Sequence, residues 1–397
     1  MFKKEGEIKK YPGFHSQYLI WMAIFTLVGT IVGAGILGIP YVVAKAGVLY
    51  GLILMIIIGI AFIYLNLFAG EVILRTNGQH QLTGYAGKYL GKTGKGFMAL
   101  SLFVNIYGAL TAYLIGEGTT LQAIFTVGSP LFWTLLFFIL GVIIVSRGIK
   151  ATGRMELYLI SLLLIVVVLI GIFSFNKINS NYYSGFNWRE LFLPYGVILF
   201  AFMGSPGIPE VHQVLSKHKK LMKEAILAGS LLPIILYVFF TIVIIGVVGV
   251  NNFSLLGPDQ RIATIALSIY SHPTLGLFAN ILAVLSMFTS FLALGLALVQ
   301  VYCYDFKMPR TTALILTFSL PLLIVLFNLT TFITVLGITG AIAGGLDGIL
   351  IILMYWKAKL LGDRKPEYSL KPHRILGTTL ILMFILGIAY QLWTLLF

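Results

Sequence analysis

The stretch GTIVGAGILGIPYVVAKAG, residues 29–47, predicts a membrane-spanning helix that is interrupted in its middle. Apolar residues lead in from Trp21, and the tripeptide Gly-Ala-Gly at 33–35 breaks the run before more apolar sequence follows. Unwound backbone is tolerated at membrane depth only where protein buries it or where it lines a cavity, and its free N–H and C=O groups then hold a carboxylate, an ammonium or an ion. The alternative is an ordinary helix with glycine packing, because Gly and Pro are frequent in membrane helices.

The composition of the chain places it in the membrane class. Of its 397 residues, 59% are hydrophobic and only 10% are charged, a balance that soluble domains of this length do not have. The net charge of +14 would suggest a nucleic-acid partner in a soluble protein, but here the charges lie in short loops. We therefore expect a lipid bilayer and no nucleic acid as a partner. Cys303 is the lone cysteine, which excludes an intrachain disulfide, and we expect no removable signal peptide.

The apolar segments predict an all-α integral membrane protein with eleven transmembrane helices. Their approximate limits are 17–47, 50–75, 96–126, 130–147, 153–175, 190–215, 223–249, 274–304, 309–328, 330–357 and 374–397. If the N-terminus is cytoplasmic, 23 of the 27 Lys and Arg residues lie in cytoplasmic segments and only three lie outside. The positive-inside rule then places the C-terminus on the outer, extracellular or periplasmic face of the cell membrane.

Two connecting segments predict short helices of their own. Residues 79–94, QHQLTGYAGKYLGKTG, are expected to form a short helix on the cytoplasmic surface. Residues 258–273, PDQRIATIALSIYSHP, are too polar to span and too apolar for a plain linker, so they predict a short amphipathic helix on the outer side. A flexible loop is the alternative for the second segment.

The sixth apolar span repeats the interruption of the first. It reads LPYGVILFAFMGSPGIPEV (193–211), and Pro206 and Pro209 each remove a backbone donor at its centre. Both interruptions contain Gly-Ile-Pro. We therefore expect a single transporter domain with a 5+5 inverted repeat, in which helices 1 and 6 are broken and face one another. The first repeat would cover 17–175, the inverted repeat 190–357, and one extra helix 374–397.

Several stretches resemble known transporters. GTIVGAGILGIPYVVAKAG looks like the first helix, and LPYGVILFAFMGSPGIPEV like the sixth helix, of amino acid/auxin permeases and bacterial hydroxy/aromatic amino acid permeases. TSFLALGLALVQVYCYDF (289–306) resembles their eighth helix, and LTGYAGKYLGK and GIKATGRMELYLI fit as well. The resemblance covers nearly the whole chain, with the sixth span closer to the amino acid/auxin branch. It implies a leucine-transporter-type fold of the amino acid/polyamine/organocation superfamily and secondary uptake of amino acids.

The two interruptions supply the groups that an amino acid needs. The half-helix that starts near Gly35 directs its N–H groups at the gap, so Ala34 and Gly35 are the expected cradle for the carboxylate, with Gly33 keeping the backbone accessible. Carbonyl groups in both gaps are expected to accept from the ammonium; they belong to Ile31, Phe202, Met203 and Gly204, with Ser205 in the same gap. Side chains expected to line the pocket are Phe200, Phe202, Asn105 and Tyr107; packing or lipid-facing aromatics are the alternative.

Thr289 and Ser290 are hydroxyl residues in the middle of the eighth span. In the superfamily that the resemblance implies, this helix runs beside the first, and paired hydroxyls there can ligate Na⁺. By the same resemblance the other ligands would be the backbone carbonyls of Gly29, Val32 and Ser286. All of these are hard oxygen donors, which suit a small hard cation. The alternative is that the two hydroxyls bond back to their own helix.

Five carboxylates lie in or near spans. Asp347 is ten residues before Lys357, which puts it about 15 Å from that span end at helical rise and therefore near mid-membrane. Glu210 follows the second interruption on its cytoplasmic side. Glu71, Glu117 and Asp305 are nearer span ends and are expected to touch water or loop cations. Asp305 is also a candidate inner gate that pairs with the basic N-terminal segment.

These features favour a secondary active transporter that imports amino acids by alternating access. No metal-ligand spacing, P-loop or nucleophile motif is present, so we expect no enzyme activity, no cofactor and no metal apart from a Na⁺ ion at Thr289 and Ser290. H⁺ symport is favoured over Na⁺ symport, because the eleven-span layout resembles the proton-coupled branch, and Asp347 is the candidate proton carrier. An amino-acid-sensing membrane receptor on the same fold is the alternative from another class.

Overall fold

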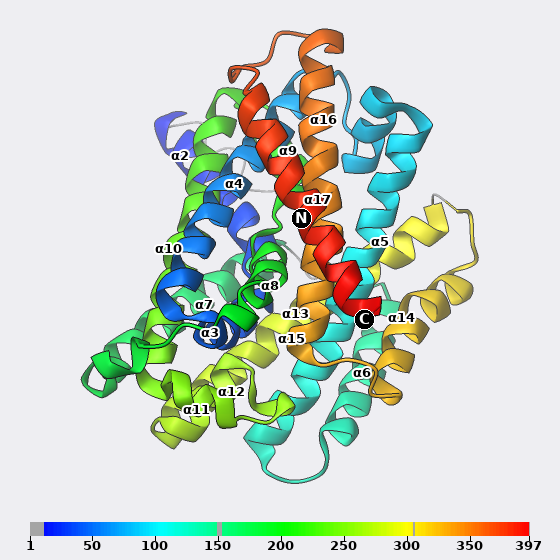
Figure 1. The fold of residues 1–397 in the computed structure, drawn as a ribbon. Coiled ribbons are helices and arrows are strands. Elements are labelled where there is room, and N and C mark those ends of the chain that lie inside the picture. Colours follow the sequence, from blue (N-terminus) through cyan, green and yellow to red (C-terminus); the bar gives the residue numbers. More distant parts are fainter. Residues whose placement is uncertain (1–11, 149–152, 305, 397) are drawn as a thin grey trace.

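The computed structural model describes residues 12–148, 153–304 and 306–396, and within these ranges the chain is a bundle of helices without strands (Figure 1). The first predicted span is broken as expected. Helix α2 (Pro12–Ile31) ends before Val32, and helix α3 (Gly35–Ala46) begins three residues later at an angle of 55°. Gly47, with φ +119°, then turns the chain into the long helix α4 (Val48–Leu74).

The remaining helices of the first half follow the predicted spans closely. Their bounds are α5 (Leu82–Phe125), α6 (Pro130–Ser146) and α7 (Gly153–Ser174). The short helix expected within 79–94 is the first part of α5, which Gly91 kinks with φ +75° and ψ −166°. Only glycine adopts such a conformation readily, so this residue separates the short segment from the long one.

The second half opens with the second broken helix. Helix α8 (Leu193–Phe202) ends before Met203, a 3₁₀ turn η4 (Ser205–Gly207) follows, and α9 (Ile208–Val214) completes the segment. The later spans are α10 (Met222–Val248), α13 (Pro273–Tyr304), α14 (Arg310–Leu326) and α17 (Arg374–Leu396). The tenth predicted span contains an irregularity that the sequence did not predict: α15 (Phe332–Thr339) passes through a π-helical turn, η7 (Gly340–Gly344), into α16 (Gly345–Leu361).

Connecting segments gather at two ends of the bundle. The segment 175–192, α11 (Val250–Leu255) and α12 (Ala263–Tyr270) lie together at the lower end in Figure 1. Helix α12 is the short helix predicted within 258–273. The 75–81 and 362–373 connections lie at the upper end, here called the basic end, where the Lys88 ammonium pairs with Asp363. This pairing holds the pKa of the Asp363 carboxyl below its usual range.

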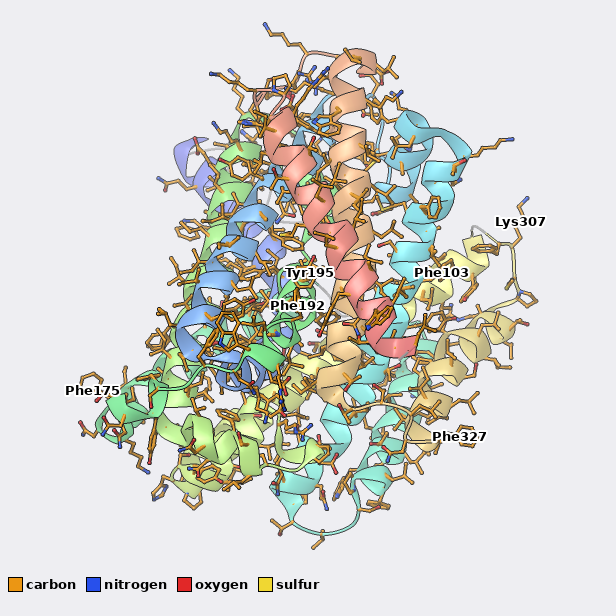
Figure 2. All side chains as sticks on the ribbon, viewed as in Figure 1. Phe103, Phe175, Phe192, Tyr195, Lys307 and Phe327 are labelled. Carbon is orange, nitrogen blue, oxygen red and sulfur yellow. The ribbon has the colours of Figure 1, made fainter. Side chains whose placement is uncertain are left out.

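The surface of the bundle suits a bilayer. Large apolar side chains are exposed along several helices, among them Ile57 on α4, Ile172 on α7 and Ile315 on α14. Phe175 and Phe327 project from the periphery (Figure 2). Helix α17 lies on the outside of the bundle and meets the start of α8, where the partly exposed Phe192 and Tyr390 rings stack at 4.3 Å. Apolar surface of this extent marks a multi-pass membrane protein.

The number of crossings is compatible with the prediction without being fixed by it. Among the described residues, seven helices are long and apolar enough to cross a membrane, or eight if α2 and α3 form one span. Helices α6 and α14 are apolar but have only 17 residues each, and α8 with α9 would form one more broken crossing. The eleven-span count, the inverted repeat and the orientation of the termini therefore stay predictions.

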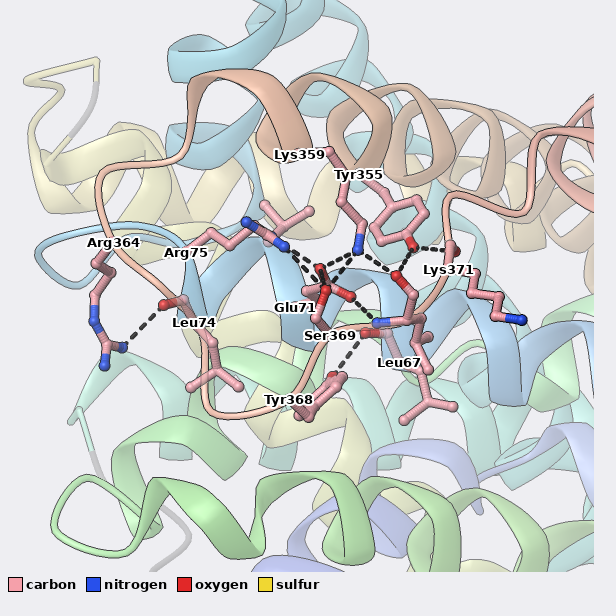
Figure 3. Close-up of polar contacts among 12 residues, drawn as sticks. Leu67, Glu71, Leu74, Arg75, Tyr355, Lys359, Arg364, Tyr368, Ser369 and Lys371 are labelled. Carbon is pink, nitrogen blue, oxygen red and sulfur yellow. Dashed lines mark hydrogen bonds and ion pairs between the residues drawn. The ribbon is translucent and has the colours of Figure 1, made fainter.

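A cluster of polar side chains around Glu71 closes the basic end (Figure 3). The Glu71 carboxylate is buried on α4 and forms ion pairs with Arg75 at 2.8 Å and with Lys359 of α16 at 2.6 Å. It also accepts hydrogen bonds from the Leu370 backbone N–H at 2.7 Å and from the Ser369 hydroxyl at 3.1 Å. The cluster therefore fastens the 362–373 connection to the ends of α4 and α16. Glu71, which was expected to touch water or loop cations, is buried and instead meets cations at the ends of two helices.

Candidate substrate and ion site

The two broken helices touch at their breaks. A Cβ built on Gly35 would lie 2.6 Å from the Ala201 Cα of α8. A Cβ on Gly204 would lie 2.5 Å from the Ile31 Cγ1 of α2, and one on Gly207 would lie 2.5 Å from the Thr30 Oγ1. All three distances are shorter than ordinary carbon contacts of about 3.5–4.0 Å. The glycines therefore allow the two interrupted backbones to approach directly.

Tyr237 of α10 links the two breaks. Its buried hydroxyl lies 2.9 Å from the Ile31 carbonyl of α2 and 3.0 Å from the Ala201 carbonyl of α8, and it donates to them. These carbonyls lie where each first half-helix ends, so their usual helical partners are missing. The sequence did not single out Tyr237. The Ile31 carbonyl was expected to accept from a substrate ammonium, and in this conformation it accepts from Tyr237.

The start of α3 is a buried helix end without a side-chain cap. Ala34 occupies the N-cap position, its side chain makes no capping bond, and Ala34 and Gly35 are both buried. The first N–H groups of a helix have no partner within it, and the helix dipole makes this end attractive to anions. Tyr113 of α5 faces the same place, because its hydroxyl would lie 3.5 Å from a Cβ on Gly33.

Tyr107 makes its contacts away from the first break, and its place in the substrate pocket stays a prediction. Its hydroxyl is 2.6 Å from the Tyr302 hydroxyl of α13 and donates to the Leu316 carbonyl of α14 at 3.0 Å. Tyr113, six residues later on the same helix, is the tyrosine that reaches the first break. Six residues rotate a helix by more than one and a half turns, so the two rings leave α5 in different directions.

The aromatic and sulfur side chains of the second break are packed in this conformation. The Phe202 ring lies 5.1 Å from the Tyr237 ring and 6.4 Å from the Phe62 ring, between α10 and α4. Phe200 and Met203 lie toward the π-helical turn: a Cβ on Gly340 would be 2.5 Å from the Phe200 backbone nitrogen, and one on Gly344 would be 3.2 Å from the Met203 Sδ. Their contact with a substrate stays a prediction.

Two of the predicted ion-site residues, Ser286 and Ser290, lie near the first break. The Ser290 side chain interacts with Tyr113, and Ser286 shares with Gly33 the lining of a small, mostly apolar cavity of about 30 Å³. The Thr289 hydroxyl donates to the Leu285 and Ser286 carbonyls of its own helix, each at 3.1 Å, which is the alternative stated for this residue. Gly29 lies against α7 and Val32 is buried. Na⁺ ligation by this set stays a prediction.

Asp347 is joined to the second break. It lies in the first turn of α16, directly after the π-helical turn, and only 5% of it is exposed. The Ser205 hydroxyl, which is 1% exposed, donates to its Oδ2. Two residues that the sequence proposed for different roles, substrate binding and ion coupling, therefore form one buried pair. Single π-helical turns within α-helices are frequent at functional sites.

The structure corrects the expectation for Glu117. This residue was expected near water at a span end, but its exposed fraction is 0% and neither carboxyl oxygen has a hydrogen-bond partner among the described residues. Asp305, the candidate inner gate, and the basic N-terminal segment expected to pair with it lie outside the described residues.

Comparison with known proteins supports the predicted resemblance. A family model described as the tryptophan/tyrosine permease family matches residues 17–394. The chain is 24% identical over 380 residues to the tyrosine-specific transport system 1 of Haemophilus influenzae, an alignment that covers 91% of this chain and 92% of the relative. It is also 24% identical over 337 residues to glutamine transporter 2 of Aliivibrio fischeri, covering 82% of this chain and 86% of that protein.

A solved structure shares the fold. The crystal structure of MhsT in complex with L-phenylalanine superposes with a TM-score of 0.66 at 18% sequence identity. The match covers 94% of this chain and 97% of that chain. The arrangement of the helices is therefore shared along nearly the whole length.

Proposed function

Because this chain belongs to the tryptophan/tyrosine permease family, we propose that it is a secondary active transporter that imports amino acids by H⁺-coupled alternating access. The observation that carries the proposal is the direct contact of two broken helices at Gly35 and Ala201, with an uncapped helix end beside it. Broken helices of this kind form the substrate sites of many transporters. The site would lie in the cell membrane, with the N-terminus in the cytoplasm.

The first break would hold the backbone end of the amino acid. The N–H groups at Gly33, Ala34 and Gly35 and the positive end of the α3 dipole would bind the carboxylate. The Tyr113 hydroxyl, beside Gly33, is a further donor for the same group. Carbonyls of the second break, from Phe202, Met203 and Gly204, would accept from the ammonium. The Gly204 carbonyl already accepts from the Gly207 N–H at 3.0 Å, but a carbonyl has two lone pairs.

The substrate would be an amino acid with an uncharged side chain. The named substrates of the relatives are tyrosine and glutamine, and the structural neighbour holds phenylalanine. The side chains next to the breaks are mostly apolar, among them Phe200, Phe202 and Met203. Such walls suit an uncharged side chain, because an unpaired charge is costly to bury.

Transport would require the two broken helices to move together against the rest of the bundle. The cavity beside Gly33 is about 30 Å³, whereas sites that bury small ligands are about 300–1,000 Å³. The substrate would therefore enter a conformation in which the broken helices move against α5, α6, α13 and α14. Exposing the site first to one side and then to the other is alternating access.

Asp347 is the proposed proton carrier at the second break. A buried carboxyl that gains and loses a proton during the cycle would change its hydrogen bond with Ser205, and this bond reaches the break directly. Na⁺ coupling through Thr289 and Ser290 is the alternative. In that case a Na⁺ ion bound to these hydroxyls would be carried in place of the proton on Asp347.

Uptake by purified protein in proteoliposomes tests both parts of the proposal. Labelled tyrosine and glutamine are offered with a pH gradient and a Na⁺ gradient imposed separately. We expect accumulation that follows the pH gradient and no requirement for Na⁺. Asp347→Asn should abolish accumulation driven by the pH gradient and spare exchange of bound amino acid. Uptake that needs Na⁺ and ignores the pH gradient contradicts H⁺ coupling, and binding of neither amino acid contradicts the proposed substrate class.

A further inference from the structure

Glu117 of α5 is a carboxylic acid that the structure buries without a partner. Its exposed fraction is 0%, and both carboxyl oxygens lack hydrogen-bond partners among the described residues. Thr120, one turn further along, is also buried and has an unpartnered hydroxyl in this part of the chain. An ionised carboxylate without a partner is strongly disfavoured in such a place, so in this conformation Glu117 holds a proton.

The helices packed around Glu117 bring no charge to it. A Cβ on Gly116 would lie 2.7 Å from the Met287 Sδ of α13 and 3.0 Å from the Phe332 ring of α15. A Cβ on Gly118 would lie 2.6 Å from the Pro130 carbonyl oxygen of α6. The segments of α6, α13 and α15 contain no Asp, Glu, Lys, Arg or His.

The titratable residues of the other helices that contact α5 lie toward its other end. Asp347 of α16 is one turn past Ala343, whose carbonyl accepts from Ser101 at 2.9 Å. Ser101 is 16 residues before Glu117, or about 24 Å along the helix. Arg310 begins α14, and the titratable side chains of α13 are in its last turn, where Tyr302 bonds to Tyr107. Glu117 and Asp347 are therefore separate sites.

The titratable group on the same face of α5 is Tyr113. Residues four apart lie above one another on a helix, about 6 Å apart along the axis. Helical side chains lean toward the N-terminus, so the Glu117 carboxyl leans toward the turn that carries Tyr113. Because the Tyr113 hydroxyl reaches the Gly33 break, Glu117 is directed toward the place proposed for the substrate carboxylate.

We propose that protonation of Glu117 is what admits the substrate carboxylate to the first break. This inference rests on the proposed function above. At an effective dielectric constant of about 20, any two negative charges within about 10 Å of each other repel enough to shift an equilibrium on the order of tenfold. An amino acid therefore binds together with a proton on Glu117. The proton comes from the solvent on the side from which the substrate enters, and it changes Glu117 from carboxylate to neutral acid.

The pH dependence of binding tests this coupling. Binding of labelled L-tyrosine and L-glutamine to the purified protein is measured from mildly acidic to mildly alkaline pH. In the wild type we expect affinity to fall on the order of tenfold as Glu117 loses its proton. Glu117→Gln should keep the acidic-pH affinity throughout, because its side chain is always neutral. Glu224→Gln, which removes an exposed glutamate at the start of α10, is the matched control and should behave as the wild type.

Two results overturn the proposal: a wild-type affinity that does not change with pH, or a pH dependence in Glu117→Gln that is as large as in the wild type. Should that variant fold poorly, Glu117→Asp keeps a titratable group, and its affinity should still fall with pH. Infrared spectroscopy needs no ligand: the wild type should show a protonated carboxyl band that Glu117→Gln lacks. A missing band refutes the buried proton and leaves the proposed function intact, whereas a band without binding of either amino acid refutes the proposed substrate class alone.

Discussion

Gly35 is the position at which one added methyl group should separate the two broken helices. In Gly35→Ala, the new Cβ would lie 2.6 Å from the Ala201 Cα and 2.7 Å from its Cβ. Neither atom can rotate away, so the helices must move apart by about 1 Å to restore ordinary carbon contacts. Overpacking of this kind costs about 1–3 kcal/mol. Since about 1.4 kcal/mol is a factor of ten, conformations in which the breaks touch should lose about tenfold to a hundredfold in population.

Substrate binding and thermal stability measure this effect together. We expect Gly35→Ala to weaken amino acid binding by about the same factor, because the carboxylate cradle and the ammonium acceptors are on opposite sides of the contact. Gly35→Val, with a larger side chain, should abolish binding while the protein stays folded in the membrane. Gly337→Ala on α15 is the matched control, because its Cβ would meet nothing closer than the Val197 side chain at 3.9 Å. Wild-type affinity and melting temperature in Gly35→Ala would refute the reasoning.

Three further predictions concern the ion, the topology and the basic end. Under H⁺ coupling, uptake needs no Na⁺, and Thr289→Ala and Ser290→Ala should not change this. If the wild type instead requires Na⁺ and both variants lose that requirement, the coupling role belongs to these two hydroxyls. A tag placed after Phe397 should be labelled from outside intact cells, and labelling only after permeabilisation would contradict the eleven-span topology. Glu71→Gln should lower the melting temperature, because breaking buried ion pairs costs about 3–5 kcal/mol; Glu224→Gln should not, and an unchanged melting temperature for Glu71→Gln would show that the cluster is not stabilising.

The two breaks were predictable because their cause is local. Pro206 and Pro209 remove backbone donors, and the Gly-Ala-Gly tripeptide at 33–35 weakens a helix whatever surrounds it. The structure shows what the sequence could not, namely that the small residues also provide the contact between the breaks. That contact depends on two segments about 170 residues apart, so no local pattern reveals which glycine meets Ala201.

Helix facing was not predictable, and it explains why the sequence pointed to Tyr107 and not to Tyr113, the tyrosine that faces the first break. Soluble helices show their buried face by alternating polar and apolar residues, whereas α5 is apolar or small on most of its surface because both lipid and protein accept such residues. The residue pattern therefore does not distinguish Tyr107 from Tyr113 as the tyrosine that faces the first break. Tyr237 was missed for the same reason, since only the packing of α10 against both half-helices shows that its hydroxyl bridges them.

The carboxylates show why position along a span is a weak guide to environment. Glu117 is nine residues before the expected end of its span at 126, which suggested contact with water. Instead the short connection to α6 folds Pro130 back onto Gly118, and Met287 closes the other side at Gly116, so the carboxyl is sealed in protein. Glu71 is also near a span end and also buried, but two cations, Arg75 at the end of α4 and Lys359 near the end of α16, form ion pairs with it. Position along the span therefore suggests the same surroundings for Glu71 and Glu117. Only the tertiary contacts distinguish Glu71, which forms structural ion pairs, from Glu117, which is buried as a protonated acid.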